Sequence, residues 1–267
     1  MRCAVPFACV IFLLFAAATA LAEVESHSAD HIPWSGHWWP YTEGGLATGF
    51  GYNGDPAPLD KYELLVDGYR SKRLTKWYLD NYASENAPYW YGLCHAWALA
   101  ACYEPGPILP SSNDNIHFNV GDKKGLLTLA HTNDLQEYGK GSDPVEFHYW
   151  LLHYIKDQKK PFVADMDPGE EVWSFPIYAY VMKQVPTGSS LLVDVTVSYA
   201  DDFVEPDFVG TKTLHKDYSY RLHLGSSGQI VSGEWTGASE NDHPDLLRYP
   251  LAAGTKHPDL SYGVVKD

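Results

Sequence analysis

The spacing of apolar residues changes near Pro161. Before that point, apolar residues between positions 58 and 82 recur every three or four residues, which predicts one or two amphipathic helices. Residues 92–102 form an alanine-rich run of high helix propensity. Residues 125–132 predict a short helix, and Asp143 followed by Pro144 is typical of a helix start. The first part of the chain is therefore predicted to be helical.

Beyond Pro161, apolar and polar residues alternate in a way that is typical of half-buried antiparallel strands. Five segments show this pattern: 161–166, 171–182, 190–199, 218–224 and 229–235. The residues Gly225-Ser226-Ser227-Gly228 separate the last two segments and predict a hairpin. Helices followed by an antiparallel sheet indicate an α+β fold.

The N-terminal residues have the features of a secretory signal peptide. A charged start at Arg2 precedes an apolar run that ends in Ala20-Leu21-Ala22, so cleavage is predicted after Ala22. An uncleaved anchor is the alternative interpretation. Residues 1–22 are then the signal, and residues 23–267 form a single catalytic domain with an aromatic-rich N-terminal arm. The prediction is a secreted, extracellular protein, or a periplasmic one if the source is bacterial.

The charge balance excludes some classes of partner. The chain has 34 acidic and 19 basic residues, which gives a formal net charge of -15. Nucleic acids and anionic lipids are bound by clustered Lys and Arg, so neither is predicted as a partner. No segment after the signal has the length and apolar character of a membrane span, and no stable membrane anchor is predicted.

The cysteine count points to one residue. Cys3 and Cys9 lie in the predicted signal, which leaves Cys94 and Cys102. On one helix these two residues are separated by about 12 Å, whereas a disulfide needs Cα atoms closer than about 7 Å. They are predicted not to be bridged to each other. A free thiol in an exported protein favours a functional role, although a small buried hydrophobic residue is the alternative.

Cys94 has the local features of a nucleophile. It is placed in the first turn of the predicted helix, where backbone N–H groups and the helix dipole stabilise a thiolate. The preceding Trp90 provides a bulky wall, and Gly92 permits a substrate backbone to approach closely. The adjacent His95 points in a different direction on a helix, so a general base is expected from elsewhere in the chain.

The residues around Cys94 resemble a known family. The stretch 90–100, Trp-Tyr-Gly-Leu-Cys-His-Ala-Trp-Ala-Leu-Ala, is similar to the catalytic stretch of the transglutaminase elicitors of oomycetes and their bacterial relatives. Residues 171–177 are similar to the Val-Trp-Asn-Gln-Pro-Val segment of that family, with Trp173 and Pro176 in place. Further similar segments are 143–148, 162–165, 233–235 and 243–245. The resemblance extends from about Trp38 to Pro250.

This resemblance implies a papain-like/transglutaminase-like core, in which the catalytic Cys lies at a helix N-terminus packed on an antiparallel sheet. It implies a protein-glutamine gamma-glutamyltransferase, in which Cys94 attacks a glutamine carboxamide and forms a thioester. The partners are then protein substrates with glutamine and lysine side chains. Calcium is the cofactor that the resemblance suggests, but the metal ligands are unknown. Neither Asp165-Met166-Asp167 nor Asp201-Asp202 matches a twelve-residue calcium loop.

The sequence departs from the family pattern at two places. Ser174-Phe175 replaces the Asn-Gln pair, which affects recognition as an elicitor more than catalysis. Leu99 stands where the family has proline, and neither residue carries a proton for catalysis.

Three further residues are candidates for proton transfer. His243 lies in a polar loop that could reach over the cysteine helix, and Asp165 interrupts an apolar strand, where burial without a partner is unfavourable. His148 lies on a helix between aromatic residues and is also interpreted as a hydrogen-bonded core residue. We predict His243 as the base, Asp165 as the acid that orients it, and His148 as the alternative base. Trp90, Gly92, Trp173 and Pro176 are predicted to shape the site.

Two other functions remain open from the sequence. A papain-like cysteine peptidase uses the same nucleophile and thioester chemistry on a main-chain amide. A non-catalytic secreted elicitor or binding protein would use an aromatic surface that includes Trp34, Trp38 and Trp39, although these rings are also typical of core packing. Reactivity of Cys94 near neutral pH separates an enzyme from a binding protein.

Overall fold

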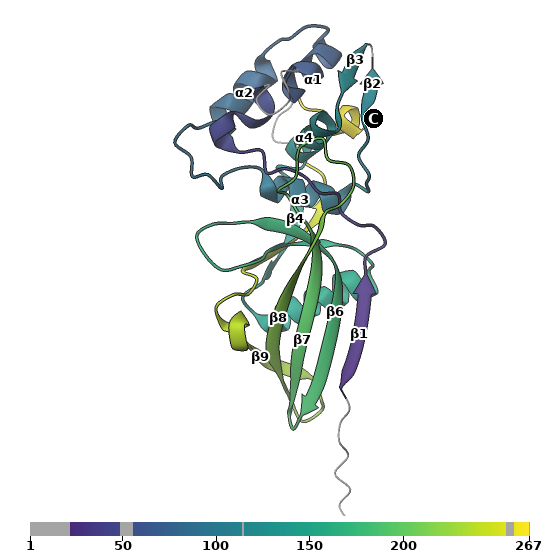
Figure 1. The fold of residues 1–267 in the computed structure, drawn as a ribbon, viewed down its shortest axis with the longest axis vertical. Coiled ribbons are helices and arrows are strands. Elements are labelled where there is room, and N and C mark those ends of the chain that lie inside the picture. Colours follow the sequence, from purple (N-terminus) through teal and green to yellow (C-terminus); the bar gives the residue numbers. More distant parts are fainter. Residues whose placement is uncertain (1–21, 49–55, 114, 255–258, 267) are drawn as a thin grey trace, which may run out of the picture.

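The computed structural model describes residues 22–48, 56–113, 115–254 and 259–266. The predicted signal peptide lies outside these residues except for Ala22. Figure 1 shows an elongated molecule with a group of helices at one end and a twisted sheet at the other. The helical end contains α1 (Pro58–Asp67), α2 (Arg73–Tyr82) and α4 (Val120–Ala130), while α3 (Cys94–Tyr103) lies where the two ends meet.

The sheet has eight strands among the described residues, and all their pairings are antiparallel. The order is β4-β10-β5-β6-β7-β8-β9, and β1 also pairs with β6. These strands are β1 (Glu23–Ser28), β4 (Leu135–Lys140), β5 (Phe162–Asp165), β6 (Ser174–Thr187), β7 (Ser190–Ala200), β8 (Thr213–Leu224), β9 (Ile230–Trp235) and β10 (Leu246–Ala252). A separate hairpin joins β2 (Ser111–Asn113) to β3 (Ile116–Phe118).

The remaining elements are short. The 3-10 helices are η1 (Tyr41–Glu43), η2 (Gly45–Ala47) and η4 (Gly237–Glu240). Helix α5 (Pro144–Trp150) continues directly into the π-helix η3 (Leu151–Asp157), and α6 (Tyr262–Lys266) follows at the C-terminal end.

The α+β prediction is confirmed, and the five predicted strands are present as β5 to β9. The helix predicted at residues 125–132 starts earlier, at Val120, because Asn119 and Asp122 form a capping box. The Asn119 backbone N–H donates to Asp122 Oδ2 at 2.7 Å. The helix start at Asp143 is also confirmed, since its carboxylate accepts the Val145 backbone N–H at 2.9 Å.

Three strands of the large sheet were not predicted, and neither was the separate β2–β3 hairpin. β1 and β4 are mostly polar and largely exposed, and β10 contains Pro250. Such sequences lack the apolar alternation that reveals a strand. They are strands because partners from distant parts of the chain supply their hydrogen bonds, as in the pairing of Arg248 with Tyr138 on one side and Val163 on the other.

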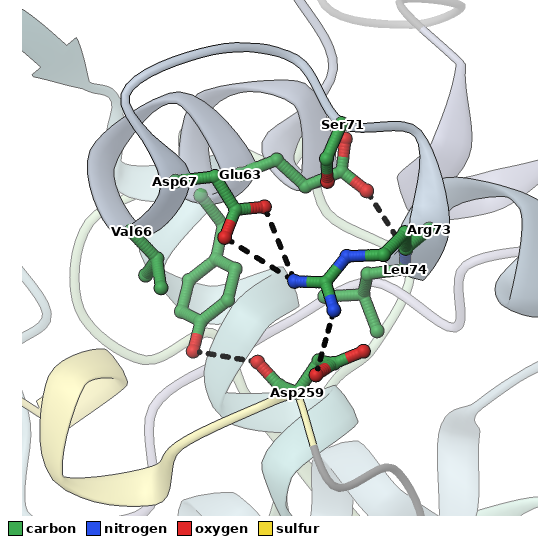
Figure 2. A pocket seen from close by; sticks show the side chains of 8 residues that line it. Glu63, Val66, Asp67, Ser71, Arg73, Leu74 and Asp259 are labelled. Atoms are coloured by element: carbon green, nitrogen blue, oxygen red, sulfur yellow. Dashed lines mark hydrogen bonds and ion pairs between the residues drawn. The ribbon is translucent and has the colours of Figure 1, made fainter.

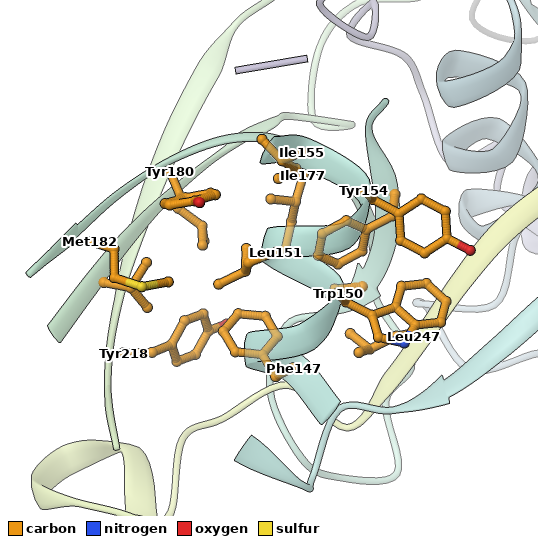
Figure 3. Packing of buried hydrophobic residues seen from close by; sticks show 14 of the residues in the cluster. Phe147, Trp150, Leu151, Tyr154, Ile155, Ile177, Tyr180, Met182, Tyr218 and Leu247 are labelled. Atoms are coloured by element: carbon orange, nitrogen blue, oxygen red, sulfur yellow. The ribbon is translucent and has the colours of Figure 1, made fainter. Parts of the chain in front are cut away.

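The larger core lies between the sheet and the helix formed by α5 and η3. Figure 3 shows Phe147, Trp150 and Leu151 of this helix packed against side chains of the strands. Phe147 and Trp150 also make ring contacts with Tyr218 and Phe162. Burial of these large rings fixes the helix on one face of the sheet.

Helix α3 is buried on nearly all sides, and Ala96 to Ala101 are fully covered. Its alanines allow neighbouring elements to approach closely, and α3 contacts α4 on one side and strands β5, β6 and β10 on the other. The N-terminal arm packs through its rings, as predicted, because Trp34 and Trp39 are 0% and 2% exposed. This packing holds the N-terminal end of α3 in a fixed place.

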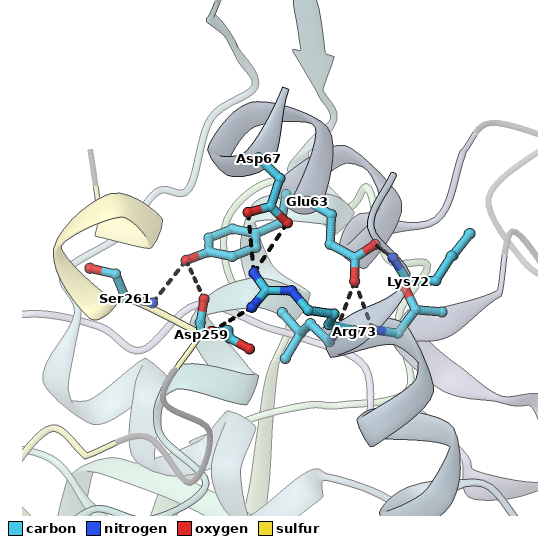
Figure 4. A network of polar contacts seen from close by, with 9 residues as sticks. Glu63, Asp67, Lys72, Arg73, Asp259 and Ser261 are labelled. Atoms are coloured by element: carbon cyan, nitrogen blue, oxygen red, sulfur yellow. Dashed lines mark hydrogen bonds and ion pairs between the residues drawn. The ribbon is translucent and has the colours of Figure 1, made fainter. Parts of the chain in front are cut away.

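Polar contacts attach the C-terminal segment to the helical end. Figure 2 shows the Arg73 guanidinium between Asp67 and Asp259, at 3.2 Å from a carboxylate oxygen of each. Tyr62 Oη donates to the Asp259 carbonyl at 3.2 Å and accepts the Ser261 backbone N–H at 2.8 Å (Figure 4). The segment after β10 therefore returns to α1 and α2.

Within the described residues, no helix has both the length and the apolar character needed to cross a membrane.

Candidate active site

Cys94 is the first residue of α3 and opens into a cavity of about 300 Å³. The Cys94 residue is 4% exposed. Besides Cys94, the cavity is lined by Tyr41, Trp90, Tyr91, Gly92, His95, Val172 and Arg248. The predicted site-shaping residues Trp90 and Gly92 are therefore in contact with the same cavity as the predicted nucleophile.

The backbone before Cys94 is held tightly by the N-terminal arm. The Leu93 backbone N–H donates to the Trp38 carbonyl oxygen at 2.5 Å. A Cβ atom on Gly92 would lie 2.3 Å from the same oxygen, which is closer than van der Waals contact allows. Glycine at this position is therefore required by the close approach of the arm, which in turn fixes Cys94.

The Cys94 thiol donates a hydrogen bond to the Val172 carbonyl at 3.5 Å. Burial, with a smaller contribution from the Asp202 carboxylate, raises the pKa of the Cys94 thiol to about 11. The backbone N–H groups of Ser174 and His95 and the Arg248 charge oppose this rise, because they favour the thiolate. The resting thiol is protonated near neutral pH. Catalysis then requires a partner that takes the proton when the thiolate forms.

Asp165 is connected to Cys94 through residues 172–174, which lead into β6. It ends β5, is 4% exposed, and its Oδ1 accepts the Trp173 backbone N–H at 3.1 Å. Burial raises the pKa of Asp165 to about 7, helped by Asp167 and Asp245 and opposed by the Trp173 N–H and by Arg248. Residues 172–174 thus contact the predicted acid on one side and Cys94 on the other.

Among the described residues, no contact joins His148 to Cys94. His148 is 4% exposed in the core between α5 and β8, where its Nδ1 lies 2.9 Å from Tyr220 Oη. Burial lowers its pKa to about 4. These contacts correspond to the core interpretation of this residue.

His243 lies in the loop between η4 and β10. Its ring stacks on Trp235 at 5.3 Å with an interplanar angle of 6°, and its Nδ1 lies 2.9 Å from the Pro244 carbonyl. Neither contact involves a residue that lines the Cys94 cavity. The role of His243 as the base stays a prediction.

Trp173 belongs to an aromatic group beside the cavity. Its ring contacts Trp38, Tyr89 and Phe203 at centroid distances of 6.3, 6.5 and 5.0 Å. The indole N–H donates to Glu171 Oε2 at 3.1 Å. Pro176 is buried in β6, where it pairs with Val163. Trp173 therefore has the surroundings of a site-shaping residue, while Pro176 supports the strand.

Two charged residues near Cys94 were not predicted as site residues. Arg248 lines the cavity from β10, a strand that the sequence pattern did not reveal. Asp202 follows β7 and is 0% exposed, whereas the sequence pattern indicates only a possible oxygen ligand at this position. No local pattern points to either residue, because each reaches the site through the arrangement of the sheet.

The predictions about the thiols and about calcium have different outcomes. Cys94 and Cys102 are both free and buried, so the prediction that they are not bridged to each other is confirmed. In the described part of the chain, no three or more His, Cys, Asp or Glu side chains are grouped to hold a metal ion. Asp201 instead pairs with Lys212 at 2.7 Å. These residues do not fit a calcium centre, and the calcium requirement stays a prediction.

Sequence comparison identifies the family. Residues 79–136 and 189–265, just over half of the chain, match the family described as transglutaminase elicitor. The chain belongs to the transglutaminase elicitor family. The matched segments of this elicitor-family chain contain Cys94, Asp202, His243 and Arg248, and they leave out the stretch with Asp165 and Trp173. No curated protein matches the sequence.

A solved structure has the same fold as this family member. The crystal structure of the GP42 transglutaminase from Phytophthora sojae matches with a TM-score of 0.79 at 22% sequence identity. The match covers 90% of this chain and 89% of the other. At this identity the likeness concerns the fold, and the chemistry of this elicitor-family site has to be argued from its own residues.

Proposed function

We propose that the protein is a protein-glutamine gamma-glutamyltransferase that acts outside the cell through a Cys94 thioester. The observation that carries this proposal is the position of Cys94, the first residue of a rigidly held helix, at an open cavity. Membership of the transglutaminase elicitor family and the fold shared with a transglutaminase support it.

The cavity suits a glutamine side chain. Tyr41, Trp90 and Tyr91 form aromatic walls that can contact the methylene groups, and Cys94 lies where the carboxamide would be presented. The thiolate attacks the carboxamide carbon, ammonia leaves, and the acyl group stays on sulfur. A lysine amine then attacks the thioester and forms the isopeptide bond. Water in place of the amine would give deamidation.

The thiol's environment also favours a second candidate, a non-catalytic elicitor. A buried thiol with a pKa raised to about 11 reacts slowly with electrophiles at neutral pH. In the enzyme, substrate binding has to be coupled to proton removal. In a binding protein, the thiol would stay inert under all conditions.

The deciding experiment is incorporation of a fluorescent primary amine into a glutamine-rich donor protein by the mature chain, with and without calcium. The wild type is expected to label the donor. Cys94→Ser is expected to show no labelling while its circular dichroism is unchanged, because a hydroxyl forms the reactive anion far less readily. The matched control is Cys102→Ser, which changes a buried cysteine at the other end of α3 and should keep most activity.

Each other outcome identifies another function. Cleavage of the donor protein that depends on Cys94 would indicate the papain-like peptidase. Neither labelling, deamidation nor cleavage, together with an unreactive Cys94, would favour the non-catalytic elicitor. Equal loss of labelling in both cysteine variants would contradict Cys94 as the nucleophile.

A further inference from the structure

Arg248 differs from the other described arginines because it has no ion-pair partner. Arg70, Arg73 and Arg221 each place a guanidinium nitrogen between 2.8 and 3.9 Å from a carboxylate oxygen. Arg248 makes no such contact in the described part of the chain, although it is half-buried in β10. Arginine is seldom withdrawn from water without a partner, so a half-buried and unpaired guanidinium indicates a place for an anion.

The position of Arg248 in the sheet brings it to the nucleophile. Its backbone pairs with Tyr138 on one side and with Val163 on the other, which fixes its register in β10. Helix α3 packs against the same strand. Arg248 and Cys94 therefore line one cavity of about 300 Å³, in which a substrate would meet both residues.

The walls of this cavity do not neutralise Arg248. None of the residues that line it has a carboxyl group: Tyr41, Trp90, Tyr91, Gly92, Cys94, His95, Val172 and Arg248. Asp165 is outside this set, is 4% exposed, and accepts the Trp173 backbone N–H. The Arg248 charge opposes the rise in pKa that burial causes at both Cys94 and Asp165, so it acts on the nucleophile without being paired to a carboxylate.

The net charge of the chain makes this local cation important for substrate binding. A formal charge of -15 repels an acidic donor protein at long range. An unpaired arginine at the cavity reverses that repulsion locally. A guanidinium can bind a carboxylate through two parallel hydrogen bonds, a geometry that adds specificity as well as affinity.

We propose that Arg248 is a specificity-determining residue that binds the carboxylate of an acidic side chain next to the reactive glutamine of the donor protein. This inference rests on the proposed function, because it names the donors that the transferase selects. The aromatic walls contact the glutamine side chain, and Arg248 holds the Asp or Glu beside it. Acidic segments of a protein are then better donors than neutral or basic ones.

The first test compares three donor peptides whose termini are blocked, so that no terminal carboxylate contributes. Each peptide has one glutamine, flanked on both sides by Asp, by Asn or by Arg. The mature chain is assayed for kcat/KM of fluorescent amine incorporation. The Asp peptide is expected to exceed the isosteric Asn peptide by about tenfold, because a charge-assisted contact at a half-buried arginine is stronger than an exposed ion pair. The Arg peptide should be the poorest donor.

Variants of Arg248 separate recognition of charge from a general role in the reaction. In Arg248→Gln, the Asp and Asn peptides are expected to react equally, while the rate with the Asn peptide is largely retained. Arg248→Glu should invert the order in favour of the Arg peptide. Arg248→Lys should keep part of the preference, because an ammonium group keeps the charge without the paired hydrogen bonds. The matched control is Arg221→Gln, which removes an exposed arginine of β8 and should leave the order unchanged.

A second measurement does not depend on acyl transfer. In a Cys102→Ser background at alkaline pH, Cys94 is alkylated in parallel with iodoacetate, an anion, and with iodoacetamide, its neutral analogue. Both reagents attack the same thiolate, so the ratio of their rates cancels the thiol pKa and reports the charge of the cavity. Arg248→Gln is expected to lower the ratio of iodoacetate to iodoacetamide severalfold, and Arg221→Gln should not change it.

The proposal is overturned if the wild type uses the Asp and Asn peptides equally, in which case the transferase itself stands. It is also overturned if Arg248→Gln slows all three peptides by the same factor, which would indicate a general role in the reaction or the fold. If Arg248→Gln does not fold, the wild-type order of the three peptides decides. If no peptide is labelled but the iodoacetate ratio still falls in Arg248→Gln, the transferase is disproved and the anion site remains.

Discussion

Buried titratable side chains lie at both ends of helix α3. The two groups differ in whether their charges have partners. At the C-terminal end, Glu104 and His131 are buried together with Asp134. At the N-terminal end, Cys94 and Asp202 are equally buried. The difference between the two ends lies in the partners of each group, because burial itself is nearly the same.

At the C-terminal end, the buried charges have partners of opposite sign. His131 Nδ1 lies 2.6 Å from Asp134 Oδ2, and its Nε2 lies 3.5 Å from Glu104 Oε1, an ion-pair distance. Tyr262 of α6 donates to the same Glu104 oxygen. Burial alone would lower the pKa of His131, but the contacts with Asp134 and Glu104 raise it. This cluster therefore contributes to stability and attaches α6.

The N-terminal end lacks such compensation in the described residues. Both Cys94 and Asp202 have raised pKa values because their charged forms are desolvated. Helix α3 has ten residues and is about 15 Å long. Its length separates the stabilising cluster around His131 from the reactive group around Cys94. The following predictions test this separation.

The largest expected effect is on stability, at the C-terminal end. His131→Ala leaves the buried Glu104 and Asp134 without their shared cation and should lower the free energy of unfolding by about 3–5 kcal/mol. Urea denaturation measures this change. The control, Arg221→Ala, removes an exposed pair with Glu234 and should cost about 1 kcal/mol or less. A loss below 1 kcal/mol for His131→Ala would show that the cluster is not stabilising.

The next effect is on activity, at the N-terminal end. Replacing a fully buried Trp with Ala lowers the free energy of unfolding by about 3–5 kcal/mol. Trp173 is half-buried, so Trp173→Ala should cost less than this. The substitution also removes the ring contacts to Trp38 and Phe203. Amine incorporation is therefore expected to fall while most of the free energy of unfolding is retained. Trp173→Phe, which retains a ring, should recover much of the activity. A folded and fully active alanine variant would contradict a role for this ring in shaping the site.

The smallest effect is the pH dependence of stability. His131 has a raised pKa, so its contribution is complete below its ordinary value of 6.5 and is lost as the pH rises through the folded-state pKa. Burial raises the pKa of Glu104, but hydrogen bonds from His131 and Tyr262 and the charge of Lys266 lower it overall, so its contribution is lost as the pH falls below 4.5. The cluster should stabilise most between pH 4.5 and 6.5.

Urea midpoints measured from pH 4 to 9 test this dependence. The wild type should lose stability above pH 6.5, and His131→Ala should show a flatter curve there. Identical curves for the two proteins would mean that other groups determine the dependence.

The sequence alone determined the features that depend on neighbours along the chain. The alanine-rich run predicted α3 because helix propensity is local, and that helix placed Cys94 in its first turn. Apolar alternation predicted β5 to β9, since each of these strands buries one face. The resemblance around Cys94 and Trp173 led to the family that the comparison then identified.

Only the tertiary structure decided the charges around the nucleophile. Asp202 and Arg248 are far from Cys94 in sequence. Arg248 reaches the site through β10, a strand that contains a proline, and Asp202 lies next to the isolated bridge between His37 and Phe203. His148 has a suggestive sequence context, but its packing against Tyr220 places it in the core. Ionisation depends on burial and on distances between remote side chains, which the linear order of residues does not contain.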